Sequence, residues 1–174
     1  MRKLTHEEIV ARQVKKLEDG RLPFCVVLNS IRSLHNVGSI FRTADAVGVE
    51  KLWLCGHTGY PPQGGIAKTA LGAENHVPWE YFQDILTLLK SLKAKNYQIV
   101  LLEQMQESIP HDQFIPKTPV CLVLGNEIEG VDDKLASFCD IAVEIPMAGI
   151  KNSLNVAVAF GVIAYQIRSK INLL

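Results

Sequence analysis

Short, continuously apolar runs alternate along this chain with segments whose apolar residues recur at helical spacing. The runs suit strands that are covered on both faces, and they lie at residues 24–29, 51–55, 97–102, 119–124 and 141–145, with a shorter extended piece at 77–81. Helices are expected at residues 36–49, 84–95, 132–138 and 153–168. Strands that alternate with helices predict an α/β domain with a mostly parallel sheet flanked by helices.

A separate amphipathic helix is expected at residues 4–20, ahead of this domain. Thr5 and Glu8 have the spacing of a capping box, which is a sequence signature of a helix start. We therefore divide the chain into an N-terminal helix at residues 1–22 and a single domain at residues 23–174.

Glycines, prolines and polar residues mark the loops between these elements. Residues 56–65 contain a Tyr-Pro-Pro run and two adjacent glycines, so no regular structure is expected there. Residues 30–35 and 104–117 are expected to be polar loops. The sequence shows no internal repeat, low-complexity tract or linker.

The composition is that of an ordinary soluble globular protein. The chain has 174 residues, of which 48% are hydrophobic and 21% are charged, and its formal net charge is zero. A neutral total does not announce a nucleic-acid binder, but it is compatible with a local basic patch. The first 20 residues are charged, unlike a signal peptide, and the longest apolar run, at 156–167, is too short to cross a bilayer. We expect a cytoplasmic protein without a membrane segment.

The four cysteines, Cys25, Cys55, Cys121 and Cys139, are widely spaced and include no C-x-x-C pair. Three of them lie in or beside apolar runs, as small buried hydrophobic residues do in a reducing cytosol. Zinc sites have closer spacing of their cysteines and histidines, so no metal site is expected.

Polar and basic residues gather where the first apolar run gives way to the next helix. They are Asn29, Arg32, His35, Asn36 and Arg42. Ligands usually bind at such strand ends in open α/β sheets, and the Arg42 guanidinium offers fixed donors for a phosphate or a developing negative charge. Arg42 is expected to lie on the helix face that turns back toward the strand end. Structural roles are equally open, because Asn36 suits a helix cap and Gly38 allows close packing.

Two more polar segments follow later apolar runs. The first, Leu124-Gly125-Asn126-Glu127 with Gly130, lacks the residues of a P-loop and the spacing of a dinucleotide fingerprint. It is compatible with a tight turn or with a functional Glu127.

The other segment is Ile-Pro-Met-Ala-Gly at residues 145–149, followed by Asn152, Ser153, Leu154 and Asn155. Its Pro/Gly loop would expose backbone groups to an adenine or a ribose. Ser153 has an ordinary role as a cap. Asn155, expected in the first helical turn, is a poor helix former that needs another explanation.

In this order, the three segments resemble the SpoU family of S-adenosylmethionine-dependent RNA ribose 2′-O-methyltransferases, within the SPOUT superfamily. The motifs are N-x-G-x-x-x-R at residues 36–42, LGNE-x-x-G at 124–130, and IPMAG at 145–149 with SLNVAVA at 153–159. Each motif alone is weakly specific, whereas the ordered set is highly specific and covers most of the chain. One departure is Ser33-Leu34, where the family usually has Asp-Pro.

The resemblance implies an α/β-knot fold, in which the C-terminal segment threads a loop to form a trefoil knot. Knots are so rare that only the resemblance supports this one. It also implies a homodimer whose active sites are completed across the interface, with the first motif and the closing helix as the candidate interface. The implied cofactor is S-adenosylmethionine, held in the knot mainly by backbone groups. The implied cofactor-binding residues are Leu124, Gly125, Ile145, Met147, Ser153 and Leu154.

Four residues match the family's catalytic and substrate-positioning residues: Asn36, Arg42, Glu127 and Asn155. The reaction would transfer a methyl group from a sulfonium to a ribose 2′-hydroxyl. Arginine, with a pKa above about 12, is a poor base, so we expect Arg42 to stabilise the forming alkoxide and to hold the flanking phosphate. Asn36 would orient Arg42 and the ribose, and Glu127 would fix Arg42 or the neighbouring loop.

RNA binding needs a basic surface near the site. The candidate residues are Arg12, Lys15, Lys16, Arg21, Arg32 and Lys68. Residues 56–65 and 68–79 are either RNA-selecting segments or ordinary surface connections. Because the N-terminal helix is short and few residues follow the closing helix, we expect tRNA rather than rRNA as the substrate, with a D-loop guanosine as the target.

Four alternatives stay open: 2′-O-methylation of rRNA, base methylation, a knotted RNA-binding protein without catalysis, and a small nucleotide-binding α/β protein. Retention of Arg42, Glu127 and Asn155 argues against the non-catalytic protein. The pairing of N-x-G-x-x-x-R with SLN favours ribose over base. A calorimetric test of S-adenosylmethionine binding would distinguish the last alternative from the methyltransferase, because a nucleotide-binding protein with unrelated chemistry predicts no binding.

Overall fold

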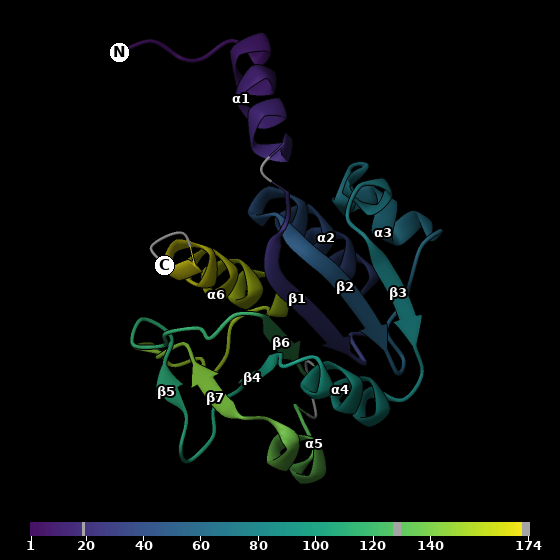
Figure 1. Cartoon of the computed structure of the whole chain (residues 1–174), viewed down its shortest axis with the longest axis vertical. Helices are drawn as coiled ribbons and strands as arrows, with labels where there is room; N and C mark the ends of the chain where they lie inside the picture. The colour runs from purple at the N-terminus through teal and green to yellow at the C-terminus, as the bar shows by residue number, and fades with distance from the viewer. Residues whose placement is uncertain (19, 127–129, 172–174) are drawn as a thin grey trace.

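The structure is a computed structural model that describes residues 1–18, 20–126 and 130–171, and for residues 13–18 the backbone alone. Its described part contains one sheet of seven parallel strands in the order β3-β2-β1-β6-β4-β7-β5 (Figure 1). The strands are β1 Leu22–Asn29, β2 Val49–Cys55, β3 Trp79–Phe82, β4 Gln98–Leu102, β5 Ile109–Pro110, β6 Val120–Leu124 and β7 Ile141–Glu144. Because all strands are parallel, their carboxyl ends meet at one edge of the sheet, as predicted for an α/β domain.

Helices cover both faces of the sheet. They are α2 Leu34–Val47, α3 Gly64–Ala70, α4 Ile85–Ala94, α5 Asp133–Phe138 and α6 Val156–Ile171, with a short 3₁₀ helix η1 Ala73–Asn75. A further helix, α1 His6–Glu18, packs none of its described side chains on the sheet. Side chains of α2, α3 and α6 share one core layer, and those of α4 and α5 share the other. No helix in the described ranges is both long and apolar enough to span a membrane.

The continuous apolar run of β1 is explained by its central place between these two layers. Phe24, Val26 and Leu28 pack on the α2/α6 side, whereas Cys25 and Val27 pack on the α4/α5 side. All five are buried. A strand that is covered on both faces has no reason to alternate apolar with polar residues.

Helices α2 and α6 lie side by side and run in the same direction. At their N-terminal ends, Asn155 Nδ2 donates a hydrogen bond to Asn36 Oδ1 at 3.1 Å. At their C-terminal ends, Arg168 Nη1 donates to the carbonyls of Ala46 and Val47, at 2.7 and 3.1 Å. The first motif and the closing helix, which lie far apart in the sequence, are therefore neighbours.

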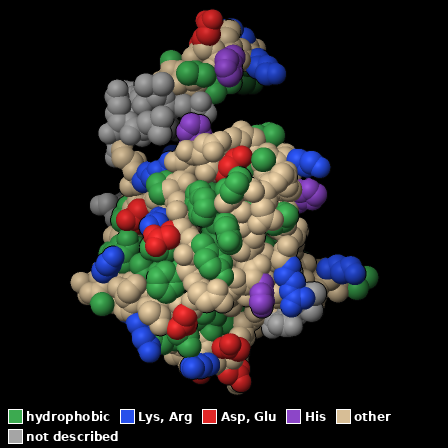
Figure 2. Space-filling model, turned by 90° about the vertical axis from the view of Figure 1, so that its right-hand side faces the viewer, with side chains coloured by type: hydrophobic (Ala, Val, Ile, Leu, Met, Phe, Trp, Pro, Cys, Tyr) green, Lys and Arg blue, Asp and Glu red, His purple; other side chains and the backbone are tan. Residues whose placement is uncertain are grey.

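Helix α1 stands away from the sheet domain in Figure 1. The predicted capping box is confirmed, because Thr5 N donates to the Glu8 carboxylate at 2.8 Å and Glu8 N donates to Thr5 Oγ1 at 3.3 Å. Figure 2 looks onto the right-hand side of the molecule in Figure 1, where β3 forms one edge of the sheet, and hydrophobic side chains gather in the middle of that face.

The starts of two helices differ from the prediction. Helix α2 begins at Leu34, and Ser33 rather than Asn36 caps it, with Ser33 Oγ accepting from Asn36 N at 3.3 Å. Helix α6 begins at Val156 instead of residue 153, so Asn155 precedes the first turn. The cap roles suggested for Asn36 and Ser153 are wrong, and Asn155 caps α6, with its Oδ1 accepting from Ala157 N.

Two segments expected to be irregular contain regular structure. Residues 64–70 form α3, although a pair of glycines opens it. Packing explains this helix: Ile66 and Ala70 are buried, and a Cβ on Gly38 of α2 would lie 2.3 Å from the Ile66 carbonyl oxygen. The close packing suggested for Gly38 is therefore confirmed. The polar loop at 104–117 contains the two-residue strand β5.

Candidate active site

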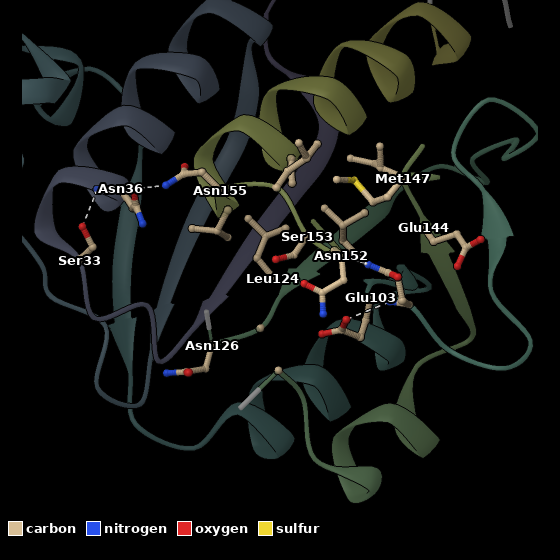
Figure 3. Close-up of a pocket in the computed structure, with 18 of the residues that line it drawn as sticks. Ser33, Asn36, Glu103, Leu124, Asn126, Glu144, Met147, Asn152, Ser153 and Asn155 are labelled. Carbon is tan, nitrogen blue, oxygen red and sulfur yellow. Dashed lines mark hydrogen bonds between the residues drawn. The ribbon is translucent and has the colours of Figure 1, made fainter. Parts of the chain in front are cut away.

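A cavity of about 970 Å³ opens at the carboxyl edge of the sheet (Figure 3). Its walls come from the ends of β4, β6 and β7, the loop before α6, and the start of α2. The strand order explains this meeting, because β4 lies between β6 and β7. The volume falls within the usual range of small-molecule sites.

All six residues predicted to hold a cofactor line this cavity: Leu124, Gly125, Ile145, Met147, Ser153 and Leu154. Asn36, Asn155 and Arg32 line it as well. Residues from motifs separated by more than 100 positions thus surround one space, as the resemblance implied. Glu127 and the side chains of Lys15 and Lys16 lie outside the described residues.

The Asn155 carboxamide is fixed at both ends. Its Oδ1 accepts from Ala157 N at 2.9 Å and so caps α6, while its Nδ2 donates to Asn36 Oδ1. Figure 3 shows the two asparagines facing each other from neighbouring helices at one side of the cavity. A residue of the closing helix is thereby held against the first motif.

The polar turn after β6 is held by close packing. A Cβ on Gly125 would lie 2.5 Å from Val131 Cγ2 and 3.0 Å from the Gly130 carbonyl oxygen, so only glycine fits there. The buried Asn126 side chain donates from Nδ2 to the Ser30 carbonyl at 2.9 Å. These contacts join the turn to the loop after β1 and fix one wall of the cavity.

Two carboxylates that the sequence analysis did not identify also line the cavity. Glu103 directly follows β4, and Glu144 ends β7. Glu144 accepts from Ser108 Oγ at 2.7 Å, and Glu103 accepts from the backbone N–H of Gln104 at 2.9 Å. Figure 3 shows Glu103 close to Asn152, whose carbonyl accepts from the Gln104 side chain. A charge directly after a buried strand was the signal that could have identified Glu103.

The predicted basic residues lie in different places. Arg32 lines the cavity, and Lys68 is exposed on α3. Arg21 precedes β1 at the opposite edge of the sheet, where its guanidinium donates to the carbonyls of Val49 and His76 at 3.0 and 2.7 Å. Arg12 is exposed on α1. The four candidates with described side chains, Arg12, Arg21, Arg32 and Lys68, therefore lie on different parts of the chain.

Arg42 is exposed on α2 and does not line the cavity. Six residues advance a helix by about 240° beyond a full turn, so Asn36 and Arg42 point in different directions. The expected position of Arg42 near the strand end, beside Asn36, is not found within one chain.

The cavity lining fits a ligand that combines an apolar ring with positive charge. Leu124, Met147 and Leu154 offer apolar surface, and Glu103 and Glu144 offer negative charge. S-adenosylmethionine, the cofactor implied by the resemblance, carries an adenine, an ammonium and a sulfonium. Within the described ranges, no cluster of three or more His, Cys, Asp or Glu side chains is placed to hold a metal ion.

Comparison with known proteins gives consistent matches. The profile of the SpoU rRNA Methylase family matches residues 23–165. The chain is 31% identical over 170 residues to a tRNA (guanosine(18)-2′-O)-methyltransferase of Aquifex aeolicus, covering 95% of this chain and 78% of that protein. It is 33% identical over 153 residues to a 23S rRNA (guanosine-2′-O-)-methyltransferase of Yersinia pestis, covering 87% of this chain and 61% of that protein.

Solved structures agree with these sequence matches. The A. aeolicus TrmH/SpoU tRNA modifying enzyme superposes with a TM-score of 0.83 at 29% identity, over 96% of this chain and 84% of that one. An AdoMet-bound rRNA methyltransferase from Sinorhizobium meliloti superposes with a TM-score of 0.80 at 29% identity, over 87% of this chain and 57% of that one. Several curated relatives are longer, and the chain spans 62–65% of their length.

Proposed function

Because this chain belongs to the SpoU rRNA methylase family, we propose that it transfers a methyl group from S-adenosylmethionine to a ribose 2′-hydroxyl of structured RNA in the cytoplasm. The observation that carries the proposal is the cavity itself. It brings the six predicted cofactor residues together with Asn36 and Asn155.

The residues divide the work between binding and positioning. When bound, S-adenosylmethionine supplies an electrophilic methyl group on a sulfonium sulfur. The apolar wall and Glu103 would hold the cofactor, and the Asn36–Asn155 pair would orient the ribose at the α2/α6 side. These residues would place the ribose 2′-hydroxyl in line with that methyl group, and the hydroxyl proton would leave to phosphate or water. Accurate placement can supply much of the rate in such a transfer.

The protein acts as a homodimer in this proposal. Helix α6 exposes an apolar stripe formed by Val158, Val162 and Tyr165, and Leu154, just before the helix, is exposed as well. Such a face on a helix that flanks the cavity suits burial against a second copy. Since Arg42 does not line its own cavity, we assign it to the cavity of the partner, where it stabilises the alkoxide and the flanking phosphate.

A tRNA is the substrate we favour, with a D-loop guanosine as the target. An A. aeolicus relative named for 2′-O-methylation of guanosine 18 in tRNA matches this chain in sequence, and an A. aeolicus TrmH/SpoU tRNA modifying enzyme matches its fold. The match to a 23S rRNA enzyme keeps rRNA as the second candidate. Mapping 2′-O-methylated nucleotides in total RNA, with and without the protein, distinguishes the two, and the absence of any new methylated site would overturn the proposal.

A mixing experiment tests the shared active site. We expect Arg42→Ala to bind S-adenosylmethionine normally in calorimetry but to lose turnover. Asn155→Asp keeps the cap of α6 but loses the donor to Asn36, and should also be inactive. Mixed dimers of the two contain one complete site, so random exchange should restore about a quarter of the wild-type activity.

The outcomes of this mixture are distinct. Normal turnover by Arg42→Ala alone would remove Arg42 from the mechanism. A mixture that stays inactive, although subunits demonstrably exchange, would show that Arg42 serves its own chain.

A further inference from the structure

Tyr60 is an aromatic residue that the cavity does not use. It is 45% exposed, yet its ring packs on two rings of β3. Its centroid lies 6.3 Å from that of Trp79 with 27° between the planes, and 4.9 Å from that of Tyr81 with 45°. The ring is therefore supported from within and open to solvent.

The loop that carries Tyr60 is tied to the loop after β1. Thr58 is buried, and its Oγ1 donates to the Leu28 carbonyl at 2.8 Å and accepts from Ile31 N at 3.0 Å. A Cβ on Gly59 would lie 2.3 Å from Leu34 Cδ2, so the backbone lies directly against the start of α2. These contacts fix the position of Tyr60 relative to α2.

The same part of α2 borders the cavity. Arg32 and Ser33, which immediately precede Leu34, line it. Since Gly59 packs on Leu34, the backbone that carries Tyr60 lies beside the rim of the cavity. An RNA strand that runs from the cavity across the start of α2 would reach Tyr60.

Basic and titratable side chains lie along this path. Arg32, His35, His57 and Lys68 are all exposed. Thr69 Oγ1 donates to the His35 carbonyl at 2.9 Å, which holds α3, and with it Lys68, against the first turn of α2. A surface that combines cationic groups with a supported aromatic ring suits a single-stranded nucleic acid.

We propose that Tyr60 stacks on an unpaired nucleobase of the substrate RNA, near the nucleotide whose ribose enters the cavity. The proposal rests on the proposed function and names the RNA-contact surface of that site. Proteins recognise RNA loops by stacking their unpaired bases on aromatic side chains.

The test compares three variants in the full-length protein. Tyr60→Phe keeps the ring, whereas Tyr60→Leu keeps an apolar cover over Trp79 and Tyr81 but cannot stack. Ile115→Ala, at another exposed hydrophobic residue, is the matched surface control. Calorimetry with S-adenosylmethionine confirms that each variant retains a folded cavity.

The main measurement is binding of an RNA hairpin that carries 2-aminopurine at each loop position in turn. At one position we expect wild type and Tyr60→Phe to quench the fluorescence, and Tyr60→Leu to lose the quenching and bind about tenfold more weakly. In turnover assays Tyr60→Leu should raise KM for RNA and leave kcat nearly unchanged.

Wild-type affinity and quenching in Tyr60→Leu would overturn the proposal, and so would an equal loss in Ile115→Ala. Binding and quenching are measured without turnover. They therefore report on stacking separately from methyl transfer. The proposed function would be contradicted by a different result, namely a wild-type protein that methylates no RNA.

Discussion

Glu103 shows how a single residue acquires a role through the strand that positions it. It follows β4, whose neighbours β6 and β7 both end at the cavity. Its Oε1 accepts from Gln104 N, and the Gln104 side chain donates to the Asn152 carbonyl. A carboxylate held in this way suits the cationic part of a ligand.

We expect Glu103→Gln to weaken binding of S-adenosylmethionine about tenfold, because the amide keeps the shape of the side chain but loses its charge. Isothermal titration calorimetry measures the change. Glu107→Gln, at an exposed position in the same loop, is the matched control and should bind normally. Equal affinities for Glu103→Gln and the wild type would contradict a role for the charge.

The cysteines give a second prediction at this scale. Cys25, Cys55 and Cys121 are buried, as the sequence predicted for three of the four. Burial raises the pKa of Cys55 to about 12, and that of Cys139 to about 11. The pKa of Cys121 is raised well above its usual value by burial. Since the thiolate is the reactive form, these thiols are protonated at pH 8.

Ellman's reagent at pH 8 should therefore react slowly with the folded protein. After unfolding in guanidinium chloride, it should react rapidly with all four thiols. The rate in the folded state should rise as pH approaches the raised pKa values. Rapid modification of Cys55 or Cys121 without unfolding would contradict their burial.

At the scale of elements, the start of α2 replaces a family feature with a chemically equivalent one. The family usually has Asp-Pro where this chain has Ser33-Leu34. Ser33 Oγ accepts from Asn36 N, so a hydroxyl performs the capping that a carboxylate can provide. The local helix start is preserved, and Asn36 stays at the cavity.

Ser33→Ala should lower stability by about 1 kcal/mol through loss of this cap. For a chain of this length, that corresponds to a decrease of about 2–4 °C in Tm. Ser33→Asp restores an acceptor and should unfold near the wild-type temperature. Circular dichroism during heating measures all three proteins, and a Tm for Ser33→Ala equal to the wild type would show that the cap contributes nothing.

Helix α3 shows why local patterns fail for some elements. Glycines have low helix propensity, so Gly64 and Gly65 indicated a loop. No side chain caps this helix, and Gln63 precedes it without a capping hydrogen bond. Its stability comes from burial of Ile66 and Ala70 against α2, which no local window contains.

For the whole molecule, the proposed dimer predicts that a charge on the apolar stripe of α6 separates the subunits. Val158 is 54% exposed in the single chain. We expect Val158→Glu to sediment as a monomer, because a carboxylate buried in an apolar interface is costly. It should bind S-adenosylmethionine but lose methylation, since each cavity then lacks the partner's Arg42.

Val10→Glu is the matched control for this experiment, because Val10 is also an exposed hydrophobic residue but lies on α1, which stands away from α6 (Figure 1). It should remain dimeric and active. A Val158→Glu protein that stays dimeric would exclude this face of α6 as the interface.

The sequence by itself determined the α/β class, most of the strands and helices, and the six residues now found around the cavity. These follow from local periodicity and from three ordered motifs, which need no knowledge of distant contacts. Tertiary structure decided what depends on strand order and helix rotation. The order β6-β4-β7 brings Glu103 and Glu144 to the same cavity. The rotation of α2 turns Asn36 toward Asn155 and leaves Arg42 exposed, because residues six apart on a helix point in different directions.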